Sequence, residues 1–379
     1  MQSKKVINRH CIVFRDKILL PSEGFIQTHY HEFNKLRPVY LANKLGWHEN
    51  EIKEKKILTS TTSIGQFWFK QTGKLSLKNI NNLNPQVIHA HFGRGGALVL
   101  PLAQKLGLPL YVTYHGGDAT KYTHQKSRII PTIYQRRLKN LQSYATGFLC
   151  VSKFIAQRLA DQGFPRHKLI THYIGINCKN IIKPTIKNGP MLFVGRLTKK
   201  KGVDLLLKAI RKLQEEKKGP LPSLYIAGSG SQEASLKKLA NGLKTIKFIG
   251  WQNHIALQKI MRYAQAIVVP SREADDGDCE GLPTVILEAI RAGTVVIATN
   301  HAGIPEIIED KVSGLLTPEG DINALADSLQ YVMLNQNKIV SFVKTAQSRL
   351  IKDFNATKQS KRLQEILLGK SRPNNYDFR

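Results

Sequence analysis

Residues 191–213 read MLFVGRLTKKKGVDLLLKAIRKL, and this stretch decides the fold class. The apolar run MLFV is followed by a glycine turn and then, from Val203, by an apolar repeat with helical spacing. A strand, a short loop and a helix in this order are typical of a βαβ unit around a parallel sheet. Similar strand patterns follow at 224–227, 246–249, 266–269 and 295–298, with helical patterns at 203–213, 232–240, 284–292 and 322–334.

The same alternation fills the first half of the chain. Strand patterns lie at 10–14, 86–90, 110–113 and 146–151, and helical patterns lie at 96–106 and 153–162. Between the halves, residues 174–190 contain two prolines and two glycines with little periodicity, which predicts a linker. We therefore expect an α/β protein of two Rossmann-like domains whose parallel sheets face a central cleft. Ligands of such sheets lie beyond the carboxyl ends of the strands.

Composition limits the class of protein. The chain has 379 residues, 42% of them hydrophobic, which excludes a disordered or fibrous protein. Cys11, Cys150, Cys178 and Cys279 form no CxxC pair, so we expect no zinc framework, no disulfides and a reducing cytosol. No apolar run is long enough to span a membrane, and residues 1–15 lack the apolar core of a signal peptide.

The net charge of +30 is unevenly distributed. Residues 1–185 contain 28 Lys and Arg against 8 Asp and Glu, which gives this half a charge of +20. Such an excess favours an anionic partner, either nucleic acid or an acidic membrane surface. The alternative is a basic surface that is simply solvated.

The loop Gly195–Gly202, GRLTKKKG, follows the first strand of the second half. Gly195 allows the chain to turn, and Arg196 and Lys201 place two cations beside a helix N-terminus. This combination suits a diphosphate. The alternative is a basic turn with exposed lysines.

A second loop, CEGLP at 279–283, leads into an apolar helix. Pro283 suits the first helical position. Glu288 is the only acidic residue in this helix and needs a partner there, because an unpaired buried carboxylate is costly. It could bind a sugar diol, or it could form a salt bridge or a cap to a neighbouring element. Glu280, eight positions earlier, lies at the helix entrance.

In the first half, Tyr114–Asp118 reads YHGGD after a strand. Its glycines allow close approach to a ligand, and His115 could act as a base, donate to a sugar hydroxyl, or simply be hydrogen-bonded in a tight turn. His89 and His91 end another strand. We expect them to face opposite sides, so that only one can point at a site, and we expect no metal there.

Two further segments are ambiguous. Asp275–Asp278, DDGD, resembles part of a metal-binding loop but is expected to be solvated. The aromatic run Phe67–Phe69, near Lys53, Lys55, Lys56, Lys70 and Lys74, could dip into a membrane interface. Burial within the first domain is the preferred interpretation of the aromatic run.

These residues resemble glycosyltransferase family 4, the retaining enzymes of GT-B fold. In the second half the resemblance rests on GRLTKKKG and on residues 270–308, PSREADDGDCEGLPTVILEAIRAGTVVIATNHAGIPEII. In the first half, PSEGFI, NPQVIHAHFG, LPLYVTYHGGD and FLCVSKFIAQRL are similar to the exopolysaccharide and colanic-acid branch. The resemblance implies an acceptor-binding domain at 1–180, a nucleotide-sugar-binding domain at 186–350, and a helix and tail at 351–379 that cross back to the first domain.

The family pattern also implies a role for each matching residue. Arg196 and Lys201 would hold the donor diphosphate, and Glu288 the ribose. Glu280 would lie by the transferred sugar, and His115 near the C6 hydroxyl of that sugar or near the acceptor. The remaining substrate contacts implied by the resemblance are Gly24, Gly195, Gly281, Leu282, Pro283 and Asp118. The branch usually has Thr where this chain has Gly24.

The implied reaction transfers a hexose, with retention, from a UDP- or GDP-sugar to a saccharide or lipid-linked saccharide in surface polysaccharide synthesis. Two cations and a helix dipole can stabilise the departing diphosphate, so we expect neither a metal nor a cofactor. The resemblance implies a cytoplasmic enzyme bound peripherally to the anionic inner face of the plasma membrane. The alternatives are a GT-B-fold sugar-nucleotide epimerase and a basic nucleic-acid-binding protein, although no nucleic-acid recognition module is found.

Overall fold

The structure, a computed structural model, describes residues 9–18, 24–46, 54–75, 80, 83–121, 131–217 and 219–370. These residues form two compact units. The first unit contains the described chain up to Gly175 and resumes at Ala356, and the second unit spans Ile176–Asn355. No helix within the described ranges combines the length and the hydropathy needed to cross a membrane.

Residues 176–190, predicted as a linker, belong to the second unit. The Ile182 N–H donates to the Arg291 carbonyl oxygen at 2.9 Å, and the Ile182 carbonyl accepts from the Gln347 side-chain amide at 2.8 Å. The boundary between the two units thus falls within the predicted linker, 174–190, and most of that segment is part of the second unit. Hydrogen bonds from neighbouring helices fix the irregular backbone, and the sequence of the segment itself carries no sign of them.

The first unit is built on a parallel seven-stranded sheet with the order β3-β2-β1-β4-β5-β6-β7. β1 pairs with β2 on one side and with β4 on the other. The strands are β1 (His10–Ile18), β2 (Arg37–Leu45), β3 (Lys56–Leu58), β4 (Pro85–His91), β5 (Leu110–Tyr114), β6 (Gly147–Cys150) and β7 (Leu169–Thr171).

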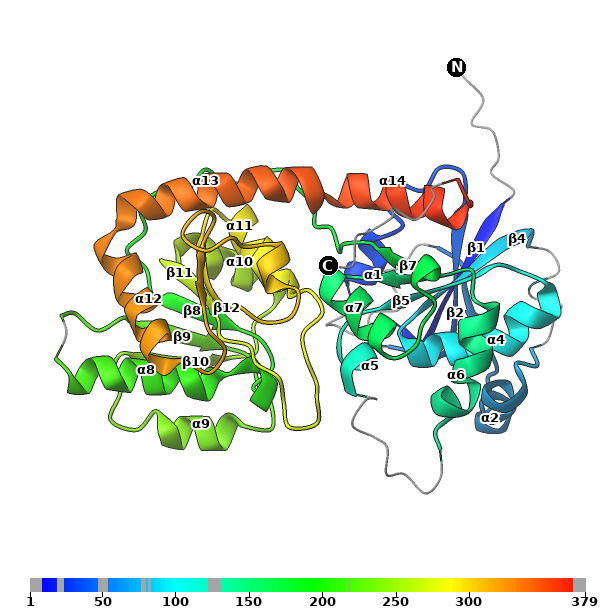
Figure 1. The fold of residues 1–379 in the computed structure, drawn as a ribbon, viewed down its shortest axis with the longest axis horizontal. Helices are drawn as coiled ribbons and strands as arrows, with labels where there is room; N and C mark the ends of the chain where they lie inside the picture. The colour runs from blue at the N-terminus through cyan, green and yellow to red at the C-terminus, as the bar shows by residue number, and fades with distance from the viewer. Residues whose placement is uncertain are drawn as a thin grey trace, which may run out of the picture. The chain divides into compact units, whose positions relative to one another are not determined.

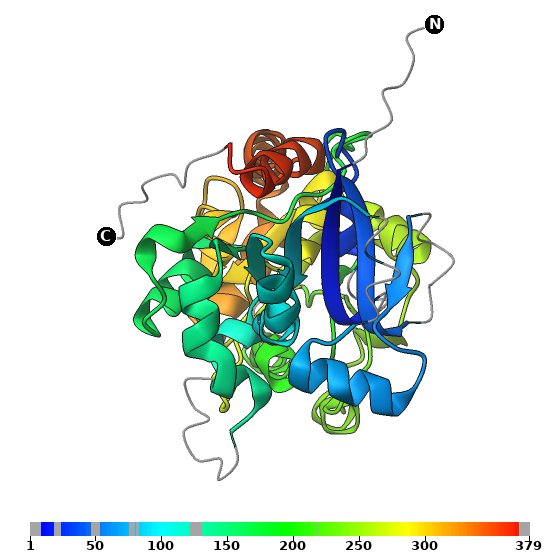
Figure 2. The same cartoon turned by 90° about the vertical axis from the view of Figure 1, so that its right-hand side faces the viewer.

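Helices pack on both faces of this sheet (Figures 1 and 2). Leu363, Ile366 and Leu367 of α14 join the core on one face, together with Ile26 of α1. On the other face Phe69 of α2 contacts Phe14 of β1. The helices are α1 (Phe25–Thr28), α2 (Ser63–Thr72), α4 (Gly93–Leu106), α5 (Gly117–Thr120), α6 (Ile133–Tyr144), α7 (Lys153–Asp161) and α14 (Ala356–Leu367).

Glycines allow α4 to approach the sheet closely. A Cβ atom at Gly96 would lie 2.7 Å from Val112 Cγ2, and one at Gly93 would lie 2.5 Å from the Tyr114 ring. Neither distance leaves room for a side chain, so the sequence GRGGA brings the start of α4 onto β5. This packing fixes the carboxyl ends of β4 and β5, where His91 and His115 lie.

The second unit contains a parallel six-stranded sheet with the order β10-β9-β8-β11-β12-β13. α8 and α9 lie on one face and α10 and α11 on the other (Figure 1). The strands are β8 (Met191–Val194), β9 (Leu224–Ala227), β10 (Ile246–Gly250), β11 (Ala266–Val269), β12 (Val295–Thr299) and β13 (Leu315–Thr317). The helices are α8 (Val203–Glu215), α9 (Glu233–Leu239), α10 (His254–Tyr263), α11 (Thr284–Arg291), α12 (Ile322–Leu334) and α13 (Gln336–Asp353).

Three strand ends of this unit meet backbone to backbone. Gly202 has φ +66°, and a Cβ atom there would lie 1.8 Å from the Pro270 carbonyl oxygen. Gly228 has φ +139°, and its Cβ atom would lie 1.9 Å from the Gly195 carbonyl oxygen. Both the conformation and the space require glycine. The loops that follow β8, β9 and β11 are therefore held against one another, and the predicted donor-site residues lie on two of them.

Candidate active site

The loops after β8 and β11 of the second unit are tied together by Arg272. Its backbone N–H donates to the Lys200 carbonyl at 2.8 Å, and its guanidinium donates to both oxygens of Asp204 at 2.9 Å. Asp204 lies in the first turn of α8. Both contacts come from one nitrogen, Nη2, and are charge-assisted hydrogen bonds. The 195–202 loop, the start of α8 and the 270–283 loop consequently form one rigid edge.

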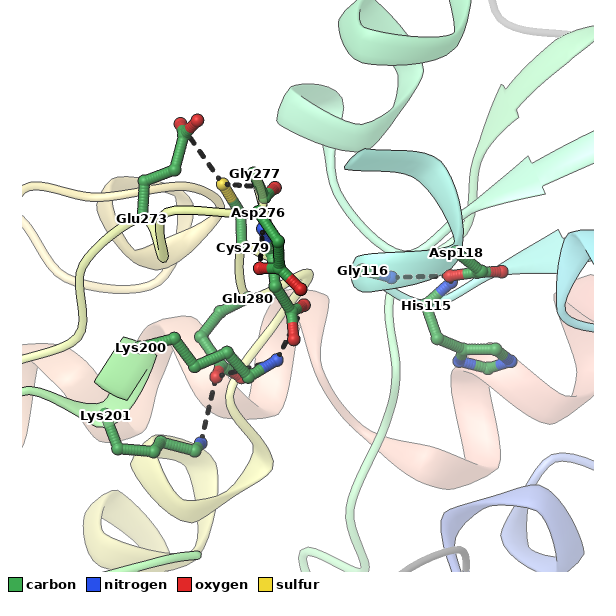
Figure 3. Close-up of polar contacts among 11 residues, drawn as sticks. His115, Gly116, Asp118, Lys200, Lys201, Glu273, Asp276, Gly277, Cys279 and Glu280 are labelled. Carbon is green, nitrogen blue, oxygen red and sulfur yellow. Dashed lines mark hydrogen bonds and ion pairs between the residues drawn. The ribbon is translucent and has the colours of Figure 1, made fainter. Parts of the chain in front are cut away.

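Two lysines of the 195–202 loop surround Glu280 (Figure 3). Lys201 Nζ lies 3.1 Å and Lys200 Nζ 3.4 Å from Glu280 Oε1, and all three side chains are at most 15% exposed. Burial raises the pKa of Glu280, but the two ammonium groups lower it more strongly, and the resulting pKa is about 2. Glu280 is therefore a carboxylate at physiological pH, and its charge is balanced before any ligand binds.

The acidic segment 275–278 also pairs with these lysines. Asp278 Oδ1 lies 3.1 Å from Lys200 Nζ, and Asp275 pairs with Lys199. The expectation that this segment is simply solvated is wrong for Asp278, whose side chain is 15% exposed. Opposite charges on two facing loops explain the difference, since sequence alone does not show which loops face each other. The alternative of a turn with exposed lysines is likewise wrong for Lys200 and Lys201.

Arg196, the second predicted diphosphate ligand, is exposed on the same loop. It makes no ion pair with any residue that the structure describes. Gly195 precedes it at the end of β8, with φ +157° and its N–H donating to the Ala227 carbonyl at 3.0 Å. The structure thus brings Gly195, Lys201 and Glu280 onto one edge and leaves the Arg196 guanidinium available at the surface.

The residues after Glu280 form the entrance to α11. Gly281, Leu282 and Pro283 are buried, and the helix begins at Thr284. Pro283 is the residue that caps the helix, one position before the first helical position predicted for it. Its fixed φ of −67° still directs the chain into the helix. α11 therefore begins four residues after Glu280.

Glu288 lies one turn further along α11. Glu288 is one of the residues that line a cavity of about 250 Å³, together with Arg262, Gln258 and Arg291. Burial raises the pKa of Glu288, and Arg291 lowers it by a smaller amount. No cationic nitrogen of the described residues lies within 4.0 Å of Glu288, so the alternative of a structural ion pair has no support. A carboxylate is able to accept hydrogen bonds from a diol, and Glu288 lines a cavity with other polar residues.

In the first unit, Asp118 holds the loop that carries His115 (Figure 3). Asp118 Oδ1 accepts from the backbone N–H groups of His115 and Gly116, both at 2.9 Å, and Oδ2 accepts from that of Gly93 at 3.0 Å. Gly116 has φ +150°, which side-chain-bearing residues rarely adopt. Asp118 therefore stabilises the backbone of the loop that carries His115. Its predicted contact with substrate stays a prediction.

His89 and His91 lie on the same face of β4, so the expectation that they face opposite sides is wrong. Residues two apart in a strand share a face. Their ring centroids are 4.6 Å apart, and each ring bonds to the Tyr30 hydroxyl. His91 Nδ1 also lies 3.1 Å from His115 Nε2. Within the described ranges, no three His, Cys, Asp or Glu side chains are arranged to hold a metal ion.

Gly24 precedes α1 and is exposed. Its φ of −57° is open to every residue, and no atom lies within 4 Å of the position of a Cβ atom. The backbone therefore does not require glycine here, and the threonine usual in the family branch would fit. The preceding residues Pro21–Glu23, which carry the rest of this motif, lie outside the described residues.

Sequence reasoning missed Lys200 and Tyr30. Lys200 is one of three consecutive lysines, and only its contacts with Asp278 and Glu280 distinguish it from exposed Lys199. Tyr30 belongs to no motif, and no local signal links it to His89 and His91, which are 59 and 61 positions away.

Comparison with known proteins assigns both halves of the chain to one type of enzyme. Residues 182–349 match the family model described as Glycosyl transferases group 1, and residues 59–180 match Glycosyltransferase Family 4. The amylovoran biosynthesis glycosyltransferase AmsK of Erwinia amylovora is 32% identical over 78% of this chain and 74% of its own length. The Escherichia coli K12 protein WcaL, described as a colanic acid biosynthesis glycosyltransferase, is 29% identical over 74% of this chain and 70% of its own.

Solved structures share the fold at low sequence identity. Anabaena HepE, in complex with UDP and glucose, has a TM-score of 0.76 at 16% identity, over 95% of this chain and 99% of HepE. Sucrose-phosphate synthase from Thermosynechococcus elongatus has a TM-score of 0.74 at 18% identity, over 96% of this chain and 100% of its own. These likenesses confirm the predicted GT-B fold of two parallel-sheet Rossmann-like units. From its family models, its relatives and its fold, the chain belongs to the family 4 glycosyltransferases of the exopolysaccharide biosynthesis type.

Proposed function

We propose that this glycosyltransferase moves a hexose from a nucleotide diphosphate sugar to a saccharide or lipid-linked saccharide acceptor in surface polysaccharide synthesis, with retention at the anomeric carbon. The observation that carries the proposal is the ion cluster of Lys200, Lys201 and Glu280 at the ends of β8 and β11. Transfer from such a donor needs cations for the diphosphate and a fixed polar group for the sugar. The relatives AmsK and WcaL, named for polysaccharide biosynthesis, and the HepE complex with UDP and glucose support this reading.

In this proposal the diphosphate binds Arg196 and Lys201 beside the start of α8. Arg196 is exposed and has no ion-pair partner among the described residues, so it can bind an anion without losing a contact. Lys201 lies close to Glu280, and Lys200 is positioned to keep the Glu280 charge balanced when Lys201 engages the donor. Glu288 receives the ribose diol in the polar cavity beside α11.

The reaction breaks the bond between the anomeric carbon and the diphosphate oxygen, and the electron pair leaves with that oxygen. The acceptor hydroxyl oxygen bonds to the same face of the anomeric carbon, and its proton passes to the departing phosphate oxygen. Arg196 and Lys201 balance the charge that develops on the diphosphate, so the proposed step requires no metal. Glu280, with a pKa of about 2 and two ammonium neighbours, is a weak nucleophile, which favours front-face attack over a covalent intermediate.

The first test is thermal stabilisation of the purified protein by a panel of UDP- and GDP-sugars. A sugar that raises the melting temperature is then incubated with the protein without acceptor, and release of the nucleoside diphosphate is measured. Slow hydrolysis with an α-configured sugar product from an α-configured donor is the expected result. An epimerase would instead change a stereocentre of the sugar, which NMR of the same mixture detects. Absence of stabilisation by every nucleotide sugar would contradict the proposal.

We also propose a peripheral contact with anionic membrane, through an apolar face of α2. Ile64, Phe67 and Trp68 are 73%, 57% and 56% exposed and, at spacings of three and four residues, share one side of the helix. Only Phe69 of the aromatic run is buried, so the preferred interpretation that the run is buried is wrong for Phe67 and Trp68. Lys70, in the last turn of α2, lies 3.7 Å from Asp16, exposed Lys74 follows the helix, and α2 itself has no acidic residue. Lys53 lies outside the described residues.

A further inference from the structure

The loop after β11, which carries Glu280, is held on both sides at its start. On the β8 side, Arg272 bonds to the loop after β8 and to α8. On the β12 side, the Glu273 N–H donates to Glu319 Oε1 at 2.7 Å. Glu319 follows β13, which pairs with β12. The loop is thus tied to neighbouring strand ends on both sides of β11.

Glu319 is itself held by His301, in the loop after β12. His301 Nδ1 lies 2.7 Å from Glu319 Oε2, and the His301 side chain is 5% exposed. A carboxylate only accepts hydrogen bonds, so the proton of this contact belongs to His301 Nδ1. The next residue, Ala302, has φ +53°, which is uncommon for a residue other than glycine. The two oxygens of Glu319 therefore receive donors from two different loops, which fixes the carboxylate between them.

Glu273 connects this carboxylate to the residue next to Glu280. Its backbone N–H donates to Glu319, and its own carboxylate accepts from the Cys279 thiol, with Sγ 3.4 Å from Oε2 (Figure 3). Residues 274–278 between them form a closed turn, since the N–H of the first donates to the carbonyl of the last at 3.1 Å. A shift of Glu273 is therefore carried to both ends of the turn, and from Cys279 to the backbone of Glu280.

The two lysines beside Glu280 do not replace this support. Lys200 and Lys201 contact its carboxyl group through long, flexible side chains, and in the proposed function Lys201 turns to the donor diphosphate. The direction in which the Glu280 side chain points then depends on its backbone, and Cys279 is the neighbour that anchors that backbone to Glu273.

We infer that Glu319 and His301 are positioning residues for Glu280. They act through Glu273 and Cys279 to fix the place of Glu280 beside the transferred sugar. Their effect on the loop follows from the contacts alone, and its consequence for transfer rests on the proposed function.

The inference separates turnover from affinity. The proposed ligands of the diphosphate and the ribose lie on the loop after β8 and on α11, whereas Glu280 is proposed to lie by the transferred sugar. Removal of Glu319 should therefore slow transfer and leave the affinity for the free nucleoside diphosphate unchanged.

Hydrogen exchange of the full chain reads the state of the loop. In Glu319→Ala the Glu273 N–H loses its acceptor, so exchange in peptides that cover residues 272–283 should accelerate about fivefold or more. Glu309→Ala, which removes an exposed carboxyl between β12 and β13, is the matched control. Exchange of these peptides at the rate of the control would overturn the inference.

Two variants of His301 test its place in the line. His301→Ala should loosen the same peptides, because Glu319 loses its second donor. His301→Asn should not, because the Asn amide can donate in place of Nδ1. Loosening by both variants, or by neither, would remove His301 from the line.

Kinetics on Glu319→Ala test the consequence for transfer. We expect kcat to fall about five- to tenfold and the affinity for the nucleoside diphosphate to stay within about twofold of the Glu309→Ala value. A parallel loss of affinity would show a general disturbance of the donor site and overturn the positioning role. A loosened loop with unchanged kcat would overturn the consequence for Glu280. A loosened loop in a protein that binds no nucleotide sugar would contradict the proposed function alone.

Variants of Cys279 test the route. Cys279→Ala removes the thiol donor to Glu273 and should lower kcat, whereas Cys279→Ser keeps a donor and should restore most of it. In the Cys279→Ala background the line is already cut, so adding Glu319→Ala should lower kcat by less than it does in the wild type. Additive losses would show that Glu319 acts by another route, and would overturn the role of Glu273 and Cys279.

Discussion

At the scale of single residues, the charge balance around Glu280 decides what the donor site can do. A buried carboxylate with one lysine would lose its only partner when that lysine turned to a diphosphate. Lys200 supplies a second ammonium group 3.4 Å away, and Lys200 is itself anchored by Asp278 at 3.1 Å. The cluster can therefore give up the Lys201 contact at moderate cost, because Glu280 keeps a counter-charge.

Lys201→Ala or Arg196→Ala should lower turnover by about 10²-fold or more with the fold intact. Each change removes a charge aimed at the departing diphosphate, and the loss of one such group typically costs about 3–4 kcal/mol in the transition state. Steady-state kinetics and circular dichroism on the purified variants provide the measurement.

Lys199→Ala is the matched control, because it removes the same charge from the same loop. Lys199 is 49% exposed and pairs only with exposed Asp275 among the described residues, so turnover should stay near the wild-type value. Turnover of Lys201→Ala and Arg196→Ala within threefold of this control would contradict the diphosphate assignment.

Glu288→Gln should weaken nucleotide binding without lowering the melting temperature. Burial raises the pKa of Glu288, so its charge is stabilised less in the free protein than in water, whereas a ribose diol would bind the carboxylate by charge-assisted hydrogen bonds of about 1.5–3 kcal/mol. Calorimetric titration with the free nucleoside diphosphate measures the affinity. Glu309→Gln, at an exposed position, is the control. Unchanged affinity together with a lower melting temperature would indicate a structural role instead.

At the scale of elements, α14 completes the first unit from the far end of the sequence. The Gln364 side-chain oxygen accepts from the backbone N–H groups of Asn34 at 2.8 Å, Lys35 at 2.7 Å and Leu36 at 3.3 Å. The segment between α1 and β2 is thus held by a side chain about 330 positions away. Tyr30 lies in the same segment, and its hydroxyl bonds to His89 and His91.

Gln364→Ala should loosen residues 30–36 selectively. It leaves backbone donors without their acceptor, at about 1–3 kcal/mol for each buried group, so hydrogen exchange of peptides from this segment should accelerate about tenfold or more. Mass spectrometry of the full chain gives the rates. Glu365→Ala, on the same helix, removes only the exposed contact with Lys35 and serves as the control. Equal rates in the two variants would rule out the proposed restraint.

Elements with their own apolar pattern could be predicted, and those ordered by neighbours could not. β8, β9, β11 and α12 begin and end where the sequence indicated, because each is a compact apolar run or repeat. β3 has one buried residue, Ile57, and α6 has two, Tyr134 and Leu141. β3 is stabilised by pairing at the edge of the sheet, and α6 by packing against α4. Neither has an apolar repeat in its own sequence that would predict it.

Part of the candidate site could likewise be predicted from the sequence, and part could not. The motif loops could be located because functional loops follow the carboxyl ends of parallel strands. Which lysine meets Glu280 depends on two loops nearly 80 positions apart, and the Tyr30 contacts join segments about 60 positions apart. Contacts of this range depend on how the strands pair, and a single sequence does not specify that pairing.

At the scale of the whole molecule, the excess of basic residues and the exposed aromatic face of α2 both favour contact with an anionic lipid surface. The chain carries 57 Lys and Arg against 27 Asp and Glu, and over half of each side chain of Phe67 and Trp68 is exposed. Basic residues gain about 1 kcal/mol each near an anionic lipid surface, and aromatic side chains are favoured at the membrane interface. Neither feature alone distinguishes a membrane from another anionic partner. Together they favour lipid, because nucleic-acid binding would not require an unpartnered apolar helix face.

We therefore expect the wild-type protein to sediment with vesicles that contain anionic lipid at low salt and to be released at high salt. The double variant Phe67→Ser and Trp68→Ser should sediment less, because it removes the apolar contact while the charge stays the same. Neutralising the exposed Lys55 and Lys74 should also weaken the low-salt binding, because it removes attraction to the anionic lipid and leaves the apolar face unchanged. Ile255→Ser removes a similarly exposed apolar side chain from the second unit, 70% exposed on α10, and should bind vesicles like the wild type. A wild-type protein that stays in solution with anionic vesicles at low salt would show that the basic charge serves another partner, and nucleic acid would become the first to test.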